Sequence, residues 1–117
     1  MEPLQLHNFT IERADILIEG IRQIHKVLMR YNDAKARNMM VSMGPNGKER
    51  VLWIDFDRAE TYDEESITAK QHGYIEFEDK IVLQFKNSMK LTLAWMLLQE
   101  ADVQHGKLKE ALLFYCT

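Results

Sequence analysis

The sequence predicts one α+β domain over residues 1–117, mainly helical with a small β-hairpin. Two segments with helical spacing of apolar residues, near 11–30 and 75–102, stand on either side of two short apolar runs separated by a turn signal. Hydrophobic residues make up 46% of the chain and charged residues 28%, which is an ordinary globular balance. A chain of 117 residues can bury a modest core.

The first helix is expected over residues 11–30. Apolar residues recur there at steps of three and four, and charged residues fall between them. Thr10 is the predicted N-cap, with Asn8 as the alternative. Gly20 lowers the helix propensity and therefore indicates a close packing contact at that position.

A loop, a hairpin and a second loop are expected next. Residues 31–38 are polar and have no periodicity. The apolar runs 39–41 and 51–54 flank Gly44-Pro45-Asn46-Gly47, which is a strong turn signal, so the pair is predicted to form a β-hairpin. Residues 55–68 are acidic and irregular.

Helical spacing returns over residues 75–102 and ends before Gly106. Asn87-Ser88 is a candidate break in this helix, and residues 108–114 suggest a short closing helix. Trp95 is expected in the core. The residues that share one apolar face are Phe77, Ile81, Phe85, Met89, Trp95 or Met96, and Leu98 or Gln99.

Charge and cysteine usage exclude several classes of protein. The formal net charge is −3 and no basic cluster stands out, so neither nucleic acid nor a membrane is an expected partner. Cys116 is the one cysteine, which rules out a disulfide scaffold. Residues 1–5 lack the features of a signal peptide, and the apolar stretch 91–98 is too short to span a bilayer. We therefore expect an intracellular, cytoplasmic protein.

The two loops carry residues suited to phosphoryl transfer. Asp33 could orient and deprotonate an attacking hydroxyl, and Lys35 could stabilise charge on the transferring group. Asn38 and Asp55 offer the hard oxygen ligands that Mg²⁺ prefers, and Asp57 is either a second metal ligand or a loop charge. The alternative for Asp33 and Asn38 is a structural role in the loop.

The order of these residues resembles the catalytic and metal-binding loops of the protein-kinase-like superfamily. The resemblance rests on Asp-x-Lys-x-x-Asn at 33–38, followed by a hairpin and by Asp55-Phe56. The lead-in at 24–28 is similar to the end of the helix before a kinase catalytic loop. The strings 37–41 and 53–59 resemble kinase-like proteins of filamentous fungi and the choline kinase and aminoglycoside phosphotransferase branch.

The resemblance implies ATP and Mg²⁺ as cofactors. It implies Asp33 as the catalytic base, Lys35 as a phosphate contact, and Asn38 and Asp55 as magnesium ligands. Tyr31 departs from the histidine usual at its position, which puts the loop geometry in question, and Asp57 stands where protein kinases have glycine. Because the sequence has no Gly-x-Gly-x-x-Gly, we expect the large-lobe portion of a kinase-like fold with the small lobe absent.

Two functions remain open from the sequence. The first is a kinase-like phosphotransferase fragment that transfers a phosphoryl group from ATP to an unknown hydroxyl acceptor and is inactive as this chain alone. The second is a non-catalytic, pseudokinase-type domain that binds a protein partner or a separately supplied small lobe. His25 is expected to be packed or hydrogen-bonded rather than catalytic, and Arg37 to be a solvated charge.

Overall fold

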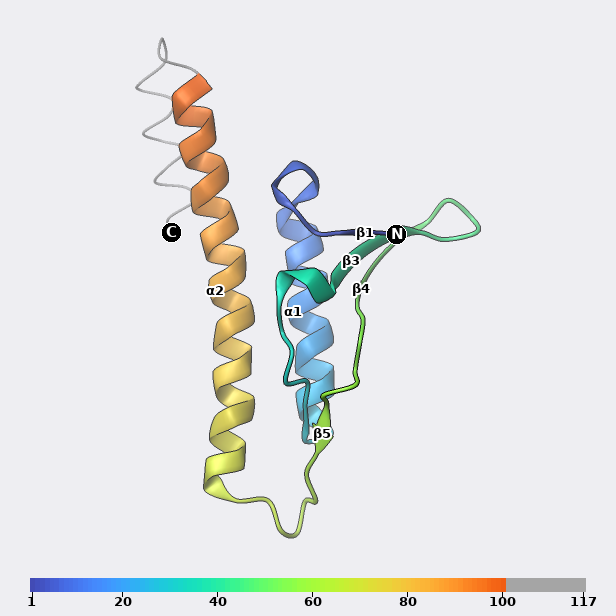
Figure 1. Cartoon of the computed structure of the whole chain (residues 1–117), viewed down its shortest axis with the longest axis vertical. Helices are drawn as coiled ribbons and strands as arrows, with labels where there is room; N and C mark the ends of the chain where they lie inside the picture. The colour runs from blue at the N-terminus through green and yellow to red at the C-terminus, as the bar shows by residue number, and fades with distance from the viewer. Residues whose placement is uncertain (101–117) are drawn as a thin grey trace. The chain divides into compact units, whose positions relative to one another are not determined.

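The structure is a computed structural model that describes residues 1–100 (Figure 1). The predicted α+β class is confirmed: helices and small antiparallel sheets alternate along the chain. Two compact units are distinguished, one over Met1–Leu83 and one that begins at Gln84. In order, the elements are β1 (Glu2–Pro3), η1 (Leu6–Asn8), α1 (Ile11–Lys26), β2 (Met29–Arg30), η2 (Ala36–Asn38), β3 (Met39–Met43), β4 (Glu49–Trp53), β5 (Glu60–Thr61) and α2 (Ala69–Glu100).

Helix α1 begins where the sequence predicts and ends four residues early. The Thr10 hydroxyl accepts a hydrogen bond from the Arg13 backbone N–H at 3.1 Å, which confirms Thr10 as the N-cap. At the other end Leu28 has a φ of 57°, a left-handed conformation that no α-helix can continue through. The next two residues form β2, which pairs with β5 in a two-stranded sheet.

The predicted hairpin is confirmed and extends further than the apolar runs. Strands β3 and β4 pair from Met39↔Trp53 to Met43↔Glu49. The turn between them requires glycine, because Gly47 has a φ of 73°. Strand β1 adds to β3 as a third, edge strand, with Glu2 opposite Val41. Residues 1–10 carry too short a pattern for the sequence to have predicted that strand.

The core of the first unit forms between α1 and β4. Trp53 is buried, and its indole N–H donates a hydrogen bond to the Leu17 carbonyl oxygen at 2.9 Å. A Cβ at Gly20 would lie 3.4 Å from Trp53 Cδ1, so the close contact predicted at this glycine is confirmed. Tyr31 packs edge-on against Trp53, with 5.2 Å between the ring centroids.

Helix α2 starts earlier than predicted and presents a different face. The Thr68 hydroxyl accepts from the Gln71 backbone N–H at 3.1 Å, which fixes the first turn. The helix runs without a break through 87–88. The predicted apolar face is wrong at Phe77 and Trp95, which are 61% and 56% exposed, whereas Ile81, Phe85 and Met89 of that face are half-buried. The buried positions in the first unit are instead Ile75, Glu78 and Val82.

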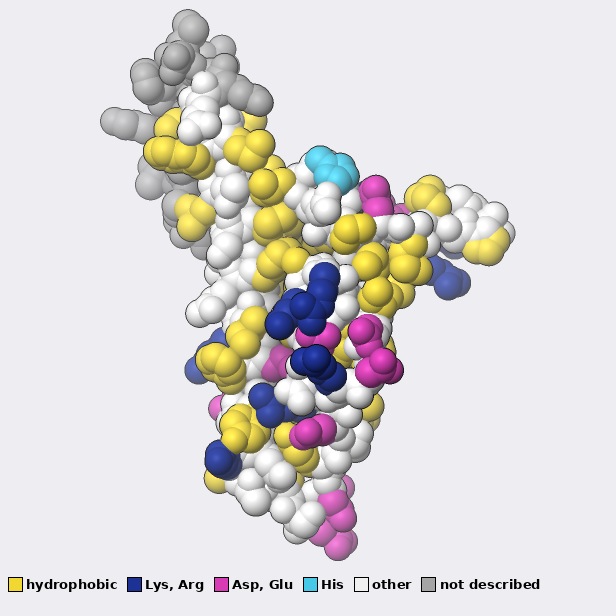
Figure 2. Space-filling view, in the orientation of Figure 1, with side chains coloured by type: hydrophobic (Ala, Val, Ile, Leu, Met, Phe, Trp, Pro, Cys, Tyr) yellow, Lys and Arg dark blue, Asp and Glu magenta, His cyan; other side chains and the backbone are white. Residues whose placement is uncertain are grey.

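The surface mixes charges of both signs. On the face seen in Figure 2, Lys and Arg side chains alternate with Asp and Glu side chains over η2 and the loop before it. Among residues 1–100, none of the helices combines the length and the apolar character needed to span a membrane. The predictions for Gly106 and for residues 108–114 lie outside the described residues.

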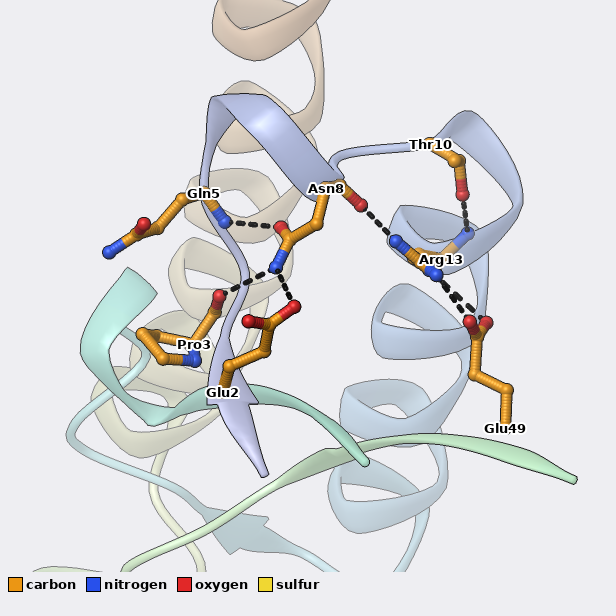
Figure 3. A network of polar contacts seen from close by, with 7 residues as sticks. All are labelled: Glu2, Pro3, Gln5, Asn8, Thr10, Arg13 and Glu49. Atoms are coloured by element: carbon orange, nitrogen blue, oxygen red, sulfur yellow. Dashed lines mark hydrogen bonds and ion pairs between the residues drawn. The ribbon is translucent and has the colours of Figure 1, made fainter. Parts of the chain in front are cut away.

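A polar network anchors the N-terminal segment to α1 and β4 (Figure 3). The Asn8 side-chain amide donates to the Glu2 carboxylate at 3.1 Å and accepts from the Gln5 backbone N–H at 2.7 Å. The Arg13 guanidinium donates to the Asn8 carbonyl oxygen and to the Glu49 carboxylate. Because α1 and β4 are both tied to this segment, the hairpin that carries the two candidate loops has a fixed position on α1.

Candidate functional site

Asp33 and Asn38 form one hydrogen-bonded pair in the loop between β2 and β3. The Asn38 side-chain nitrogen donates to Asp33 Oδ2 at 2.8 Å and to the Asp33 carbonyl oxygen at 2.9 Å. The second carboxylate oxygen, Oδ1, accepts from Arg37 Nη2 at 2.9 Å. Arg37 is thus not the purely solvated charge that the sequence suggested, because its guanidinium reaches back four residues to the carboxylate.

The surroundings of Asp33 favour its ionised form. Its side chain is only 5% exposed. The hydrogen bond from Asn38 lowers the pKa of Asp33 most, and the charges of Arg37 and Arg58 lower it further, while burial opposes them. Each carboxylate oxygen has two lone pairs and accepts one described hydrogen bond, so each can accept another.

The second loop begins where the hairpin ladder ends. The Ile54 backbone N–H donates to the Asn38 carbonyl oxygen at 3.0 Å, which brings the end of the first loop and the start of the second to the same end of the hairpin. The next residue, Asp55, has a φ of 61°, an uncommon conformation for a residue with a Cβ. Its Oδ1 accepts from the Asp57 backbone N–H at 3.3 Å, and both aspartates are exposed. Left-handed backbone of this kind is enriched at functional sites.

Tyr31 joins the two loops directly. The side chain is fully buried, and its hydroxyl donates a hydrogen bond to the Ile54 carbonyl oxygen. Its ring also contacts Phe56, with 4.9 Å between centroids. Burial raises the pKa of Tyr31 to about 12, so the phenol stays a neutral donor. Because Tyr31 replaces the usual histidine, the sequence put the loop geometry in question; in the structure this tyrosine holds the two loops together.

Glu78 is a site-organising residue that sequence reasoning missed. It comes from α2, is 5% exposed, and accepts hydrogen bonds from the backbone N–H groups of Tyr31 and Asn32, both at 2.8 Å. Its carboxylate therefore fixes the start of the Asp33 loop. The only local signal was a carboxylate on a helix face, since its partners lie more than forty residues away in sequence.

His25 links Glu78 to α1. Its Nε2 lies 2.8 Å from Glu78 Oε1 and its Nδ1 lies 2.8 Å from Asp79 Oδ1. Burial opposes a charge on the imidazole, but the two carboxylates outweigh it and raise the pKa of His25. Burial likewise opposes ionisation of Glu78, and the hydrogen bonds from His25 and the loop lower the pKa of Glu78 overall. The prediction that His25 is packed and hydrogen-bonded is confirmed.

The oxygen donors of the two loops fit a magnesium ion better than a soft metal. Both N–H groups of the Asn38 amide face Asp33, which leaves the amide oxygen as an acceptor. Asp55 adds an exposed carboxylate. Within residues 1–100 no three His, Cys, Asp or Glu side chains gather as a metal site. Mg²⁺ needs few protein ligands when phosphate and water supply the rest, so the expected metal does not depend on such a cluster.

Comparison with known proteins finds no relative for this chain. No protein-family model, no curated protein and no solved structure matches it. The roles of Asp33, Lys35, Asn38, Asp55 and Asp57 therefore rest on their chemistry and on the geometry of the two loops.

Proposed function

We propose that this chain is part of a kinase-like phosphotransferase that uses ATP and Mg²⁺ to phosphorylate a hydroxyl group. In this proposal residues 1–83 correspond to large-lobe elements of such a fold. The observation that carries it is the Asp33–Asn38 pair, which is joined to the start of the Asp55 loop through Ile54. A base and an amide ligand in one loop, with a carboxylate at the start of the next, are among the groups that kinases use for phosphoryl transfer to an alcohol.

Asp33 acts mainly by orienting the acceptor. Because its pKa is lowered, the carboxylate is a weak base, and a loose phosphoryl-transfer transition state asks for little proton abstraction before the new bond forms. A free lone pair on either oxygen accepts the acceptor's O–H. Lys35, exposed two residues on, stabilises negative charge on the transferring group.

The metal-side residues are Asn38 and Asp55, with Asp57 as a further candidate. They would hold Mg²⁺, which neutralises phosphate charge when bound. The Asp33 hydrogen bonds fix the direction of the Asn38 amide, so its oxygen is oriented before any ligand arrives. This pre-orientation lowers the entropy cost of binding.

Calorimetric titration with ATP, with and without magnesium, tests the proposal. We expect Mg²⁺-dependent binding that weakens at least tenfold in Asp55→Asn. Asp63→Asn is a matched control, because Asp63 is also exposed and its Oδ1 also accepts the backbone N–H two residues on, here at 3.1 Å from Glu65. Equal affinity of the two variants, or no binding at millimolar ATP, would contradict the proposal.

A second candidate function is a non-catalytic protein-interaction domain. It uses the same fold without catalysis. If the folded chain does not bind Mg²⁺-ATP, this second function is the better supported of the two.

A further inference from the structure

A small cavity is lined in part by Asp33 and Lys35, and most of its other lining residues have no role in the function proposed above. Its volume is about 260 Å³, slightly below the range of about 300–1,000 Å³ usual for sites that take drug-sized ligands. Its lining combines charged and apolar side chains from β2, from the loop before β3 and from α2, among them Arg30, Asp33, Lys35, Tyr74, Phe77 and Ile81.

One wall of the cavity is apolar. Tyr74, Phe77 and Ile81 are spaced three and four residues apart, so they follow one face of α2. Phe77 is 61% exposed, although its helix neighbours Ile75 and Glu78 are buried. A ligand with an apolar body would cover this ring and gain the free energy of removing it from water.

The acidic side chains at the cavity already have ion-pair partners, whereas the basic ones have none in the described part of the chain. The carboxylate of Asp33 is already paired with Arg37, and that of Glu78 with His25. Arg30 and Lys35 have no ion pair within 4.0 Å among residues 1–100. The cavity therefore offers two uncompensated cations to a ligand, and an anionic group complements them.

Arg30 is held in a position suited to a carboxylate. Its guanidinium lies over the Tyr74 ring, with Cζ 4.3 Å from the ring centroid. This contact with the ring uses none of the guanidinium N–H donors as an ion-pair donor, and their planar arrangement matches the two oxygens of a carboxylate. The aromatic ring thus orients the arginine before the ligand binds.

We propose that this cavity binds the acceptor, and that the acceptor is a small hydroxy acid with an apolar, preferably aromatic, body. Its carboxylate pairs with Arg30, its apolar body covers Phe77 and Ile81, and its hydroxyl donates to Asp33. The inference rests on the proposed function. In the reaction the hydroxyl oxygen bonds to the γ-phosphorus of ATP as the bond from that phosphorus to the ADP oxygen breaks. The hydroxyl proton passes to Asp33 and then to water.

A set of four probes separates the three contacts, with binding to the full chain measured by calorimetry or NMR in the absence of nucleotide. The parent probe is 3-phenyllactate. Lactate lacks its ring, 3-phenylpropanoate lacks its hydroxyl, and 1-phenyl-2-propanol has a methyl group in place of its carboxylate. We expect 3-phenyllactate to bind at least tenfold more tightly than each of the other three.

Substitutions then assign each contact. Arg30→Gln should weaken 3-phenyllactate at least tenfold and leave 1-phenyl-2-propanol unchanged, which also shows that the variant is folded. Arg50→Gln, on the exposed part of β4, is the control and should change neither. Phe77→Ala should weaken both probes, whereas Leu83→Ala, at another exposed apolar position of α2, should weaken neither.

The outcomes distinguish this inference from the function on which it rests. No binding of 3-phenyllactate at millimolar concentration, or equal loss in Arg30→Gln and Arg50→Gln, overturns the cavity assignment even where Mg²⁺-ATP binds as proposed. Equal affinity for 3-phenylpropanoate overturns the role of the cavity as acceptor site. Binding of 3-phenyllactate with the expected pattern, but without Mg²⁺-ATP binding, supports the ligand class and contradicts the phosphotransferase.

Discussion

Removal of the Glu78 carboxylate should destabilise the first unit strongly. In Glu78→Ala the backbone N–H groups of Tyr31 and Asn32 lose their described acceptor, and His25 loses one of its two carboxylates. A buried donor left unsatisfied costs about 1–3 kcal/mol, so two donors cost about 2–6 kcal/mol. Breaking a buried ion pair by removing one partner costs about 3–5 kcal/mol, and because these figures describe the same contacts, we expect a total of about 3–5 kcal/mol.

The assay is urea unfolding at neutral pH, followed by circular dichroism. Glu76→Ala is the matched control, because Glu76 is exposed on the same helix and the substitution has the same effect on helix propensity. We expect the control to change the free energy of unfolding by no more than about 0.5 kcal/mol. A difference below about 1 kcal/mol between the two variants would refute the reasoning, since it would mean that water replaces the carboxylate at little cost.

Two further predictions concern α1. The pKa of His25 is raised above 6.5, so the stability that His25 contributes is complete below pH 6.5 and is lost as the pH rises through its folded-state pKa. The pKa of Glu78 is lowered below 4.5, so the stability that Glu78 contributes is lost only as the pH falls through its folded-state pKa. The urea concentration at the unfolding midpoint should therefore fall as the pH is raised from about 5.5 to about 8.5. His25→Gln should remove this pH dependence, whereas the control His72→Gln, at an exposed histidine, should retain it. Gly20→Ala should raise the free energy of unfolding by up to about 1 kcal/mol, because the added Cβ meets Trp53 at ordinary contact distance. Gly20→Leu should lower it by about 1–3 kcal/mol in the same urea assay, because the larger side chain collides with that ring; a stabilised Gly20→Leu would contradict the packing described here.

The sequence predicted the elements whose signals are local. Periodicity placed α1, the Gly44–Gly47 turn placed the hairpin, and Thr10 marked a helix start, because each depends on residues a few positions apart. The same local order placed Asp33 and Asn38 in one loop and Asp55 at a strand end. Short-range chemistry therefore sufficed to nominate the candidate residues.

The sequence failed where contacts between distant segments decide the outcome. Apolar spacing selected Phe77 of α2 for burial, but the structure buries its neighbour Glu78 instead, because that carboxylate satisfies His25 and two loop amides. Strand β1 was also missed, since two residues carry no pattern and only pairing with β3 makes them a strand.

By itself, the sequence predicted the α+β class, the hairpin and the candidate residues that the proposed function uses. Only the tertiary structure decided how those residues are held. Glu78 fixes the start of the first loop across more than forty residues, and Tyr31 ties that loop to Ile54. The reason is physical: buried backbone N–H groups must find acceptors, and folding decides which distant side chain supplies them.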